Sequence, residues 1–411
     1  MASQSENFAL IRVVGVGGAG SNAVNRMIRA ELLGVEFIAV NTDAQALVKS
    51  HAPTRIRIGD AISRGLGAGG DSVVGERAAQ EDLENLRTAL DGSDLVFVTA
   101  GMGGGTGSGA APVVAKVAKD LGALTIGIIT KPFEFEGKRR AAVANAAAEE
   151  LRKYVDTLII IPNERLLSVV SRQTSMEDSF RIADDVLRQA VQGVSDVITV
   201  PGIINLDFAD VRSIMKDAGS ALMGIGRASG ESRARAAAEL AIASPLLELD
   251  IQGATGVLVN VAASSTVTLH EVNEAINHIT ERADREANII FGTSLDETLA
   301  DEVQITVIAT GFAGNARSES GRASSQRDEF PYGHDREGST WSAAAPGSTA
   351  PITTAPYEAP VQPAPASTWT PSTHPAVSQE PIAPHLASEG VSPAPVAGDE
   401  LEIPAFLRRR S

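Results

Sequence analysis

Apolar residues follow two different spacings in the first part of the chain. Runs of β-branched and aliphatic residues, which are typical of buried strands, occupy residues 8–16, 35–41, 94–100, 123–130 and 157–162. Between these runs, apolar residues recur every three or four positions, as in amphipathic helices, at residues 21–31, 72–90, 108–121 and 138–154. This alternation predicts an α/β fold, in which a Rossmann-like parallel sheet is covered by helices on both faces.

A longer helical pattern at residues 176–200 predicts a central helix, because its apolar spacing extends too far for a simple connector. Beyond it, strand-like runs at residues 255–263 and 303–310 flank a helical stretch at residues 269–284. We therefore expect a second, smaller mixed α/β domain. The expected parts are a nucleotide domain (1–175), the central helix and its connection (176–204), and the second domain (205–312).

The composition changes sharply near Gly311. Thirteen of the 20 prolines lie in residues 313–400, among many Ala, Ser and Thr residues. Such a segment cannot bury enough apolar surface to offset the entropy of ordering, so we predict that residues 313–398 form a disordered linker. Apolar residues return in residues 399–411, which we predict to be a partner-binding peptide. Its candidate contact residues are Leu401, Ile403, Pro404, Phe406, Leu407 and Arg408.

Charge and cysteine content narrow the possible functions. The 411-residue chain has 35 Lys and Arg against 51 Asp and Glu, and a formal charge of -16 argues against general nucleic-acid binding. The absence of cysteine excludes disulfides and thiolate chemistry, and six histidines leave little for an imidazole metal site. Residues 1–7 lack the features of a secretory signal, and no run is apolar enough to span a membrane. We expect a cytosolic protein with no direct membrane span.

The first expected strand runs into Gly15-Val16-Gly17-Gly18-Ala19-Gly20, which matches the pattern G-x-G-x-x-G. Glycines let the backbone approach an anion closely, and the following helix start offers free N–H groups and a positive dipole end. The turn therefore favours phosphate binding, although similar turns also serve only for packing. One alternative is a nicotinamide-dependent oxidoreductase, in which Asp43 would be the acid that follows the second strand.

A second and richer glycine loop follows the strand at residues 94–100. It reads Gly101-Met102-Gly103-Gly104-Gly105-Thr106-Gly107-Ser108-Gly109 and again precedes a helix. So many small residues form a nest of N–H groups that can wrap a di- or triphosphate. No Lys-Ser or Lys-Thr pair closes the loop, so it is not a Walker A motif. Two phosphate cradles favour a nucleoside triphosphate over a dinucleotide.

The two loops and three further motifs resemble the FtsZ family of bacterial tubulin homologues. The run of residues 103–109 resembles the signature of tubulin itself, and the motifs follow the family's order across residues 8–312. The resemblance implies the tubulin/FtsZ fold and a GTPase that polymerises into the midcell division ring. The further motifs are Asn41-Thr42-Asp43-Ala44-Gln45, Lys131-Pro132-Phe133-Glu134-Phe135-Glu136-Gly137 and Asn205-Leu206-Asp207-Phe208-Ala209-Asp210.

The resemblance also implies which residues contact the phosphates of GTP or GDP. Many relatives have glycine at the position of Ala19, so a positive φ there would strain this chain slightly. Mg²⁺ would be held mainly by the phosphates and water, so we predict no protein metal cage. The implied phosphate contacts are Gly18, Ala19, Gly20, Ser21 and Asn22 on one side, and Gly105, Thr106 and Gly107 on the other.

Sugar and base contacts are implied in the same way, and each has a structural alternative. Glu136 and Arg140 would lie near the sugar and phosphate, although their spacing alone predicts an i,i+4 ion pair. Either Asp184 or Asp185 would accept hydrogen bonds from guanine, because adjacent helical residues point about 100° apart. The secondary candidates are Asn163 and Phe180, and core packing explains Phe180 equally well.

Asn205, Asp207 and Asp210 are the candidate catalytic residues. Taken alone, Asp207 is an expected helix N-cap and Asp210 an acid of the first turn. The resemblance implies a loop that enters the next subunit's nucleotide pocket, where the two acids orient the attacking water and Asn205 positions the loop. This loop follows the central helix, so we expect it at the end of the sheet opposite the phosphate loops.

The implied partners follow from this arrangement. The chain would bind itself in a head-to-tail homopolymer, and the C-terminal peptide would bind membrane-tethering division proteins. Arg409 and Arg410 would join Arg408 against acidic partners or lipid headgroups. A different alternative is a GTP-dependent adaptor that does not hydrolyse GTP, in which the two acids only cap a helix.

Overall fold

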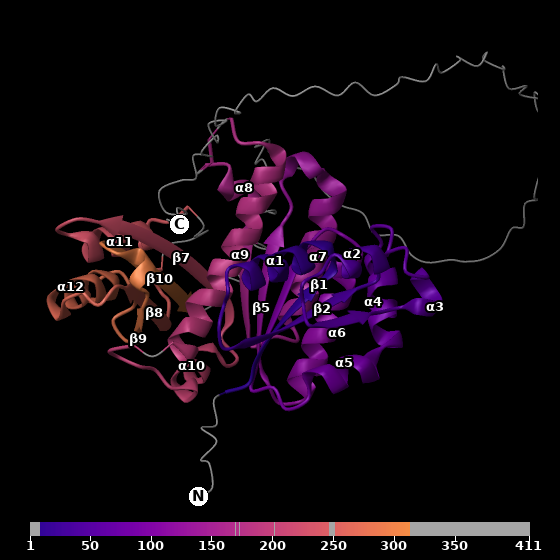
Figure 1. Cartoon of the computed structure of the whole chain (residues 1–411), viewed down its shortest axis with the longest axis horizontal. Helices are drawn as coiled ribbons and strands as arrows, with labels where there is room; N and C mark the ends of the chain where they lie inside the picture. Colours follow the sequence, from indigo (N-terminus) through magenta and orange to yellow (C-terminus); the bar gives the residue numbers. More distant parts are fainter. Residues whose placement is uncertain (1–8, 169, 172, 201, 246–250, 313–411) are drawn as a thin grey trace, which may run out of the picture. The chain divides into compact units, whose positions relative to one another are not determined.

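The computed structural model describes residues 9–312 apart from 169, 172, 201 and 246–250 (Figure 1). The predicted linker and C-terminal peptide lie outside the described residues. In the described part no helix is long and apolar enough to cross a membrane.

The first half is a parallel sheet, as predicted. Its strands run in the order β3-β2-β1-β4-β5-β6, and all neighbouring pairs are parallel. Between β1 and β4 the strand order changes direction, which is where open α/β sheets bind ligands at their carboxyl edge. The strands are β1 (Ile11–Val16), β2 (Val35–Asn41), β3 (Thr54–Arg57), β4 (Leu95–Gly101), β5 (Leu124–Lys131) and β6 (Thr157–Pro162).

Helices cover both faces of this sheet. One face packs against α1 (Gly17–Arg29), α2 (Ala44–Val48) and α9 (Met176–Thr199). The other packs against α4 (Ser72–Glu81), α5 (Leu83–Leu90), α6 (Thr106–Asp120) and α7 (Lys138–Arg152). Short elements at the strand ends are α3 (Asp60–Ser63), η1 (Glu134–Glu136) and α8 (Asn163–Leu166). The strands are therefore buried on both faces, which accounts for their nearly continuous apolar runs.

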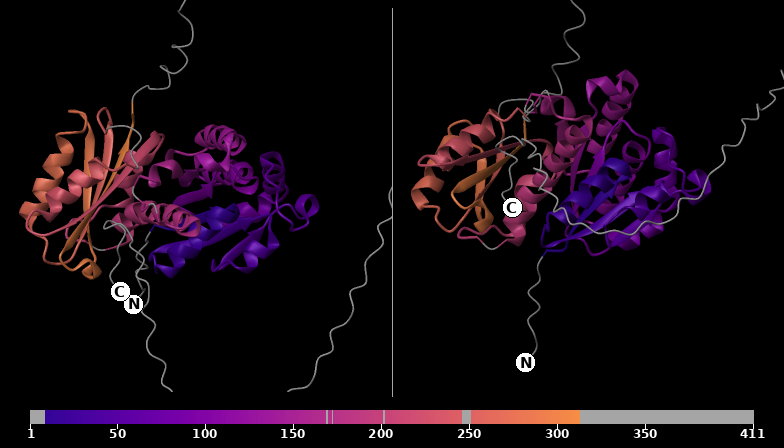
Figure 2. Two further views of the ribbon diagram at one scale, coloured as in Figure 1. Left: turned by 90° about the horizontal axis from the view of Figure 1, so that it is seen from above. Right: turned by 45° about the horizontal axis from the view of Figure 1, so that its top comes forward.

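The central helix α9 joins the two halves (Figures 1 and 2). Its apolar face shares one core with strands of both halves, including Ile159 of β6 and Ile308 of β10. The sheet continues through β7 (Gly219–Ser229), β10 (Glu302–Thr310), β8 (Gly256–Ala263) and β9 (Asn288–Leu295), with β10 antiparallel to both of its neighbours. The remaining elements are α10 (Phe208–Met215), α11 (Arg233–Ile242), α12 (Leu269–Thr280) and η2 (Glu297–Leu299).

The structure corrects several predicted elements. The single helix expected at residues 72–90 is two helices, because Asp82 leaves helical geometry and accepts a hydrogen bond from the Gly59 N–H at 2.8 Å. Both glycine-rich helices begin earlier than predicted, at Gly17 and Thr106. The strands β3, β7 and β9 and the helices α2, α3, α8 and α11 were not predicted.

Candidate functional site

Two helices begin at the carboxyl edge of adjacent strands. α1 follows β1 directly and α6 follows β4, and a Cβ atom at Gly17 would lie 2.8 Å from the Gly107 nitrogen, so the two starts touch. Neither helix has a side-chain cap or an acid in its first turn. By contrast, α2, α4, α9 and α12 are capped by their own side chains. Two adjacent uncapped helix starts have the chemistry to hold an anion, because their N–H groups and dipoles attract negative charge.

The predicted glycines of this site divide into two kinds. Three are enclosed by protein atoms, since an added Cβ would come within 2.4, 2.8 and 2.7 Å of a neighbour at Gly20, Gly105 and Gly107. These three allow backbone segments to pack closely. At Gly18 and Gly104, no atom lies within 4 Å of the Cβ position. Their missing side chains leave open space at the helix starts, which is where a phosphate would need it.

Ser21 contributes an unsatisfied donor to the same place. It is 3% exposed, and its hydroxyl has no hydrogen-bond partner among the described residues. Such a group costs about 1–3 kcal/mol when left unpaired, so an acceptor from a ligand suits this position. The hydroxyl of Thr106 is already bonded to that of Thr42 at 2.6 Å, which leaves Thr106 its backbone N–H. Ala19 does not have a positive φ, so the expected strain does not arise, and Asn22 is exposed.

Aromatic rings lie beyond β5. Phe133 is buried, stacks on Phe135 at 5.0 Å between ring centroids and meets Phe180 of α9 edge-on at 5.5 Å. Phe180 remains 38% exposed, so core packing covers only part of its ring and leaves a face for a planar ligand. Asn163, at the end of β6, is 5% exposed and its Oδ1 atom has no partner among the described residues.

Glu136 and Arg140 form the ion pair that their spacing predicts. Glu136 also accepts a hydrogen bond from the Phe133 N–H at 2.9 Å, which holds the short 3₁₀ turn. Arg140 is more than half exposed, whereas the side chain of Glu136 is 10% exposed. Their predicted contact with the nucleotide remains a prediction.

Asp184 and Asp185 face different surroundings. Asp184 Oδ2 accepts from Arg26 Nε of α1 at 3.1 Å, and it lies one helical turn from Phe180, on the same face of α9. Burial raises the pKa of Asp184 to about 6, although the hydrogen bond and charge of Arg26 act against this rise. Asp184 is thus a partly buried carboxyl group beside α1, the helix that follows the first glycine loop.

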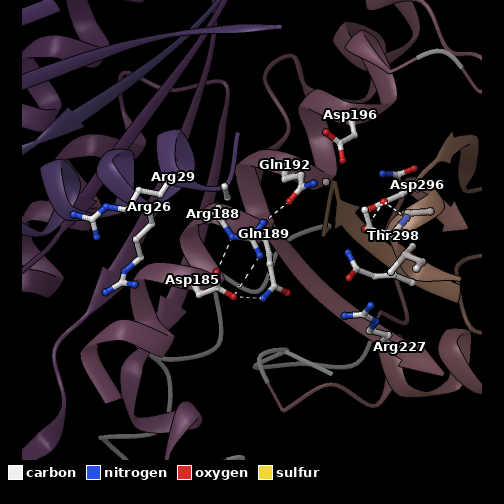
Figure 3. Close-up of a pocket in the computed structure, with 16 residues that line it drawn as sticks. Arg26, Arg29, Asp185, Arg188, Gln189, Gln192, Asp196, Arg227, Asp296 and Thr298 are labelled. Atoms are coloured by element: carbon white, nitrogen blue, oxygen red, sulfur yellow. Dashed lines mark hydrogen bonds and ion pairs between the residues drawn. The ribbon is translucent and has the colours of Figure 1, made fainter. Parts of the chain in front are cut away.

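Asp185 follows Asp184 on α9 and therefore points about 100° away from it around the helix. Its oxygens accept from Arg188 Nε at 2.6 Å and from Gln189 Nε2 at 2.6 Å. Asp185, Arg188 and Gln189 line a cavity of about 290 Å³ between α1 and the strands of the second domain. Figure 3 shows how these three side chains point toward one another. The two acids therefore bond to different partners, and Asp184 is the one that lies on the same face of α9 as Phe180.

The motif that contains Asn205, Asp207 and Asp210 lies at the opposite edge of the sheet. α9 ends near the start of β2, since a Cβ atom at Gly34 would lie 2.6 Å from the side chain of Thr199. At the end of α10, the Met215 carbonyl accepts from the hydroxyl of Thr157, the first residue of β6. Residues 202–215 thus lie at the amino edge. β1 alone is six residues long, which is about 20 Å at about 3.3 Å per residue, so the two sites are far apart within one chain.

At this amino edge, Asp207 is the N-cap of α10. Its Oδ1 atom accepts from the Asp210 N–H at 2.8 Å, so the capping interpretation is confirmed for Asp207. The carboxylate of Asp210 has no hydrogen-bond or ion-pair partner among the described residues, which leaves it available. Asn205 and Asp207 are exposed.

Comparisons with known proteins identify the family. The model of the Tubulin/FtsZ family GTPase domain matches residues 10–171, and that of the FtsZ family C-terminal domain matches residues 219–313. FtsZ of M. jannaschii, solved as an empty dimer, is 44% identical, with a TM-score of 0.72 over 75% of this chain and 89% of that chain. The chain belongs to the FtsZ family.

Two other solved structures are similar to this chain. A tryptophan-to-tyrosine mutant of M. jannaschii FtsZ is also 44% identical, with a TM-score of 0.73, and the match covers 75% of this chain and 92% of that one. CetZ1 of Haloferax volcanii, solved as a GDP-bound monomer, shares the fold at 22% identity, with a TM-score of 0.64 over 74% and 94% of the two chains. Membership of the FtsZ family makes this protein a polymerising cell-division GTPase.

The family assignment decides between the functional alternatives. The oxidoreductase interpretation is wrong, and Asp43 instead caps α2 by accepting from the Gln45 and Ala46 N–H groups at 2.8 and 3.2 Å. The sequence analysis did not single out Arg26, the partner of Asp184. Its position four residues after Asn22, on the helix that leaves the first phosphate loop, was the available signal.

Proposed function

We propose that this protein hydrolyses GTP at the interface between consecutive subunits of a head-to-tail filament. The observation that carries the proposal is the separation of the two sites. The uncapped helix starts lie at the carboxyl edge of the sheet, and the acids of α10 lie at the amino edge. Since these edges cannot meet within one chain, the acids act on the nucleotide of a neighbour.

On the carboxyl edge, backbone N–H groups at the starts of α1 and α6 hold the phosphates. Gly18, Ala19, Gly20, Ser21 and Asn22 form one side of this proposed cradle. The other side consists of Gly105, Thr106 and Gly107. Support comes from the open space beside Gly18 and from the unpaired hydroxyl of Ser21.

Sugar and base would bind beside the cradle. Asp184 is our choice for the guanine contact, because a carboxylate accepts from guanine N1–H and N2–H₂, donors that adenine lacks at those positions. Phe180 stacks on the base, and Asn163 supplies its unpaired Oδ1. Glu136 and Arg140 take the sugar and phosphate side.

Mg²⁺ fits this site as a phosphate-bound ion. Among the described residues, no three His, Cys, Asp or Glu side chains are grouped to hold a metal, and Mg²⁺ commonly keeps several waters when it binds substrate phosphates. When bound, it would neutralise the charge that the cradle, which has no P-loop lysine, leaves uncompensated.

On the amino edge, Asp210 is the main acid acting on the attacking water. Its carboxylate has no partner among the described residues, whereas one oxygen of Asp207 caps α10. Asp207 would polarise the water with its second oxygen, and Asn205 would position the loop in the neighbouring pocket. Carboxylates in such roles typically contribute 10²–10⁴-fold to the rate.

A contact between the carboxyl edge of one subunit and the amino edge of the next is heterologous, so it generates open filaments. The M. jannaschii relative was solved as a dimer, which supports self-association. We further propose that the filaments assemble at midcell beneath the membrane. Their anchor would be residues 399–411, bound to membrane-tethering division proteins.

The test compares Asp210→Ala and Asp210→Asn with the wild type. Both variants should bind GTP with unchanged affinity and still assemble, as followed by light scattering. Their phosphate release should be slower by about 10²-fold or more, because neither side chain can accept the proton of water. Normal turnover by filaments of either variant would falsify the shared-site mechanism.

A further inference from the structure

The segment that leads to the catalytic acids presents alternate residues to solvent. Ile203, Asn205 and Asp207 are exposed, whereas Ile204 and Leu206 are partly buried. Alternation of this kind is expected of an extended chain that lies along another element, because successive side chains point to opposite sides. Which residues face outward therefore depends on how this segment is fixed to its neighbour.

Thr293 of β9 holds this segment through the backbone N–H and C=O groups of Ile204. The Ile204 N–H donates to Thr293 Oγ1 at 2.8 Å, and the Thr293 N–H donates to the Ile204 carbonyl at 2.9 Å. Thr293 is 7% exposed, so these bonds are shielded from water. The contact is close, since a Cβ atom at Gly202 would lie 1.4 Å from the Thr293 carbonyl oxygen. Only glycine fits the loop side of this contact without a shift.

Leu206 gives the segment a second inward contact. It packs against the core shared by α9 and the sheet, and a Cβ atom at Gly292 would lie 3.3 Å from Leu206 Cγ. Ile204 is thus hydrogen-bonded to Thr293, and Leu206 lies against Gly292, the preceding residue of β9. A slip of one residue would turn Asn205 and Asp207 inward, for the reason that applies to strand register.

We propose that Thr293 is a positioning residue for GTP hydrolysis, which sets the register of residues 202–207 and thereby aims Asn205, Asp207 and the start of α10 at the next subunit. The proposal rests on the proposed function of Asp207 and Asp210. Thr293 itself touches neither nucleotide nor water, and it acts only through the Ile204 backbone.

The test uses full-length Thr293→Val, which keeps the shape of the side chain but removes the acceptor of the Ile204 N–H. We expect turnover per polymerised subunit to fall about tenfold or more, since small misplacements of catalytic groups have effects of this size. GTP affinity of the unpolymerised protein should change less than about twofold, because the nucleotide site is at the other edge. Amide hydrogen exchange at Ile204 should become faster.

Two variants control for a purely structural effect. Thr293→Ser keeps the hydroxyl and should restore turnover and slow exchange at Ile204. Ser294→Ala removes the next hydroxyl of β9, which bonds to Asn260 at 3.2 Å, and should leave turnover unchanged. Should Thr293→Val fail to fold, Gly202→Ala disturbs the same contact from the loop and carries the same expectation.

The outcomes separate this inference from the proposed function. Wild-type turnover by Thr293→Val or Gly202→Ala filaments, with Asp210→Ala inactive, would overturn the role of Thr293 and leave the shared site intact. Wild-type turnover by Asp210→Ala would overturn the shared site itself. An equal loss of turnover in Ser294→Ala would also contradict the inference, because it would show a general effect of β9.

Discussion

The helices that begin at the two edges of the sheet differ in whether side chains satisfy their first N–H groups. At the carboxyl edge, α1 and α6 begin without side-chain caps and without acids in the first turn, so their first N–H groups can bind an anion. At the amino edge, α10 begins with Asp207 as its cap and Asp210 in its first turn. The first turns of α1 and α6 thus lack the acids that the first turn of α10 carries. This difference is what the proposed shared site requires, because each edge would supply one half of it.

Neighbouring glycines of the first loop offer the strongest way to test the carboxyl edge. Gly18→Val places its side chain in open space, so we expect the fold to persist while GTP affinity falls by about 100-fold or more through steric exclusion. Gly20→Ala meets the Thr99 carbonyl at 2.4 Å and should instead destabilise the fold by about 1–3 kcal/mol. Nucleotide titration and denaturant unfolding measure the two effects. Equal behaviour of the two variants would contradict the division of the glycines.

Asp184 and Asp185 provide a matched pair for the base contact. Asp184→Asn should reduce the preference for GTP over ATP by about 10- to 100-fold, because an amide cannot accept from both guanine donors. Asp185→Asn should change it little, since Asp185 is bonded to Arg188 and Gln189 of its own helix. Competition binding with the two nucleotides is the measurement. A larger effect of Asp185→Asn would reverse our assignment.

The raised pKa of Asp184 predicts a pH dependence with a definite sign. Between pH 6 and 4 the folded state without nucleotide binds more protons at this residue than the unfolded state does, because its folded pKa is about 6 rather than 3.8. The contribution of Asp184 to the free energy of unfolding should therefore rise as the pH falls through this range, by at most about 1.4 kcal/mol per pH unit.

Asp184→Asn is the control for this titration, since it removes the titrating group. Urea unfolding of both proteins at pH 7 and pH 5 isolates the contribution of Asp184. If the difference between the two proteins does not change with pH, the carboxylate is not buried as described. GTP affinity of the wild type relative to Asp184→Asn should fall over the same range, as the accepting carboxylate becomes protonated.

The smallest expected effect separates capping from catalysis at Asp207. Asp207→Ala should lower the free energy of unfolding by about 1 kcal/mol, whereas Asp207→Asn should not, because asparagine caps helices as well as aspartate. Both should slow turnover if the charge of Asp207 acts on the neighbour's water. Denaturant unfolding and phosphate release measure the two properties separately. Full turnover by Asp207→Asn would reduce Asp207 to a cap.

Much of the fold was predictable because the sheet of the first half is buried on both faces. Its apolar runs at β2 and β6 gave the observed bounds, and the spacing of α9 gave the central helix. β7 was missed because its sequence, with Gly219, Gly224 and Gly226, does not resemble a strand. The structure explains Gly226, where an added Cβ would lie 1.9 Å from the Ala237 carbonyl of α11. The need for glycine at such positions comes from packing between elements, which a single sequence does not show.

The site was predictable in its parts and not in its arrangement. Glycine-rich turns before helices indicated the phosphate loops, but spacing alone did not distinguish the open position at Gly18 from the packed position at Gly20. The different partners of Asp184 and Asp185 could not be predicted, because Arg26, which bonds to Asp184, comes from another helix. The hydrogen bonds between Thr293 and Ile204 join residues that are 89 positions apart, so no local sequence pattern could predict them.

The most direct measurement of the shared site is GTP turnover by a mixture of Gly18→Val and Asp210→Ala. The first variant lacks a working carboxyl edge and the second a working amino edge, so each alone should be nearly inactive. Their mixture should regain turnover, because the nucleotide of an Asp210→Ala subunit then meets the intact acids of a Gly18→Val subunit. A mixture no more active than the sum of its components, despite co-assembly, would contradict a site built from two subunits.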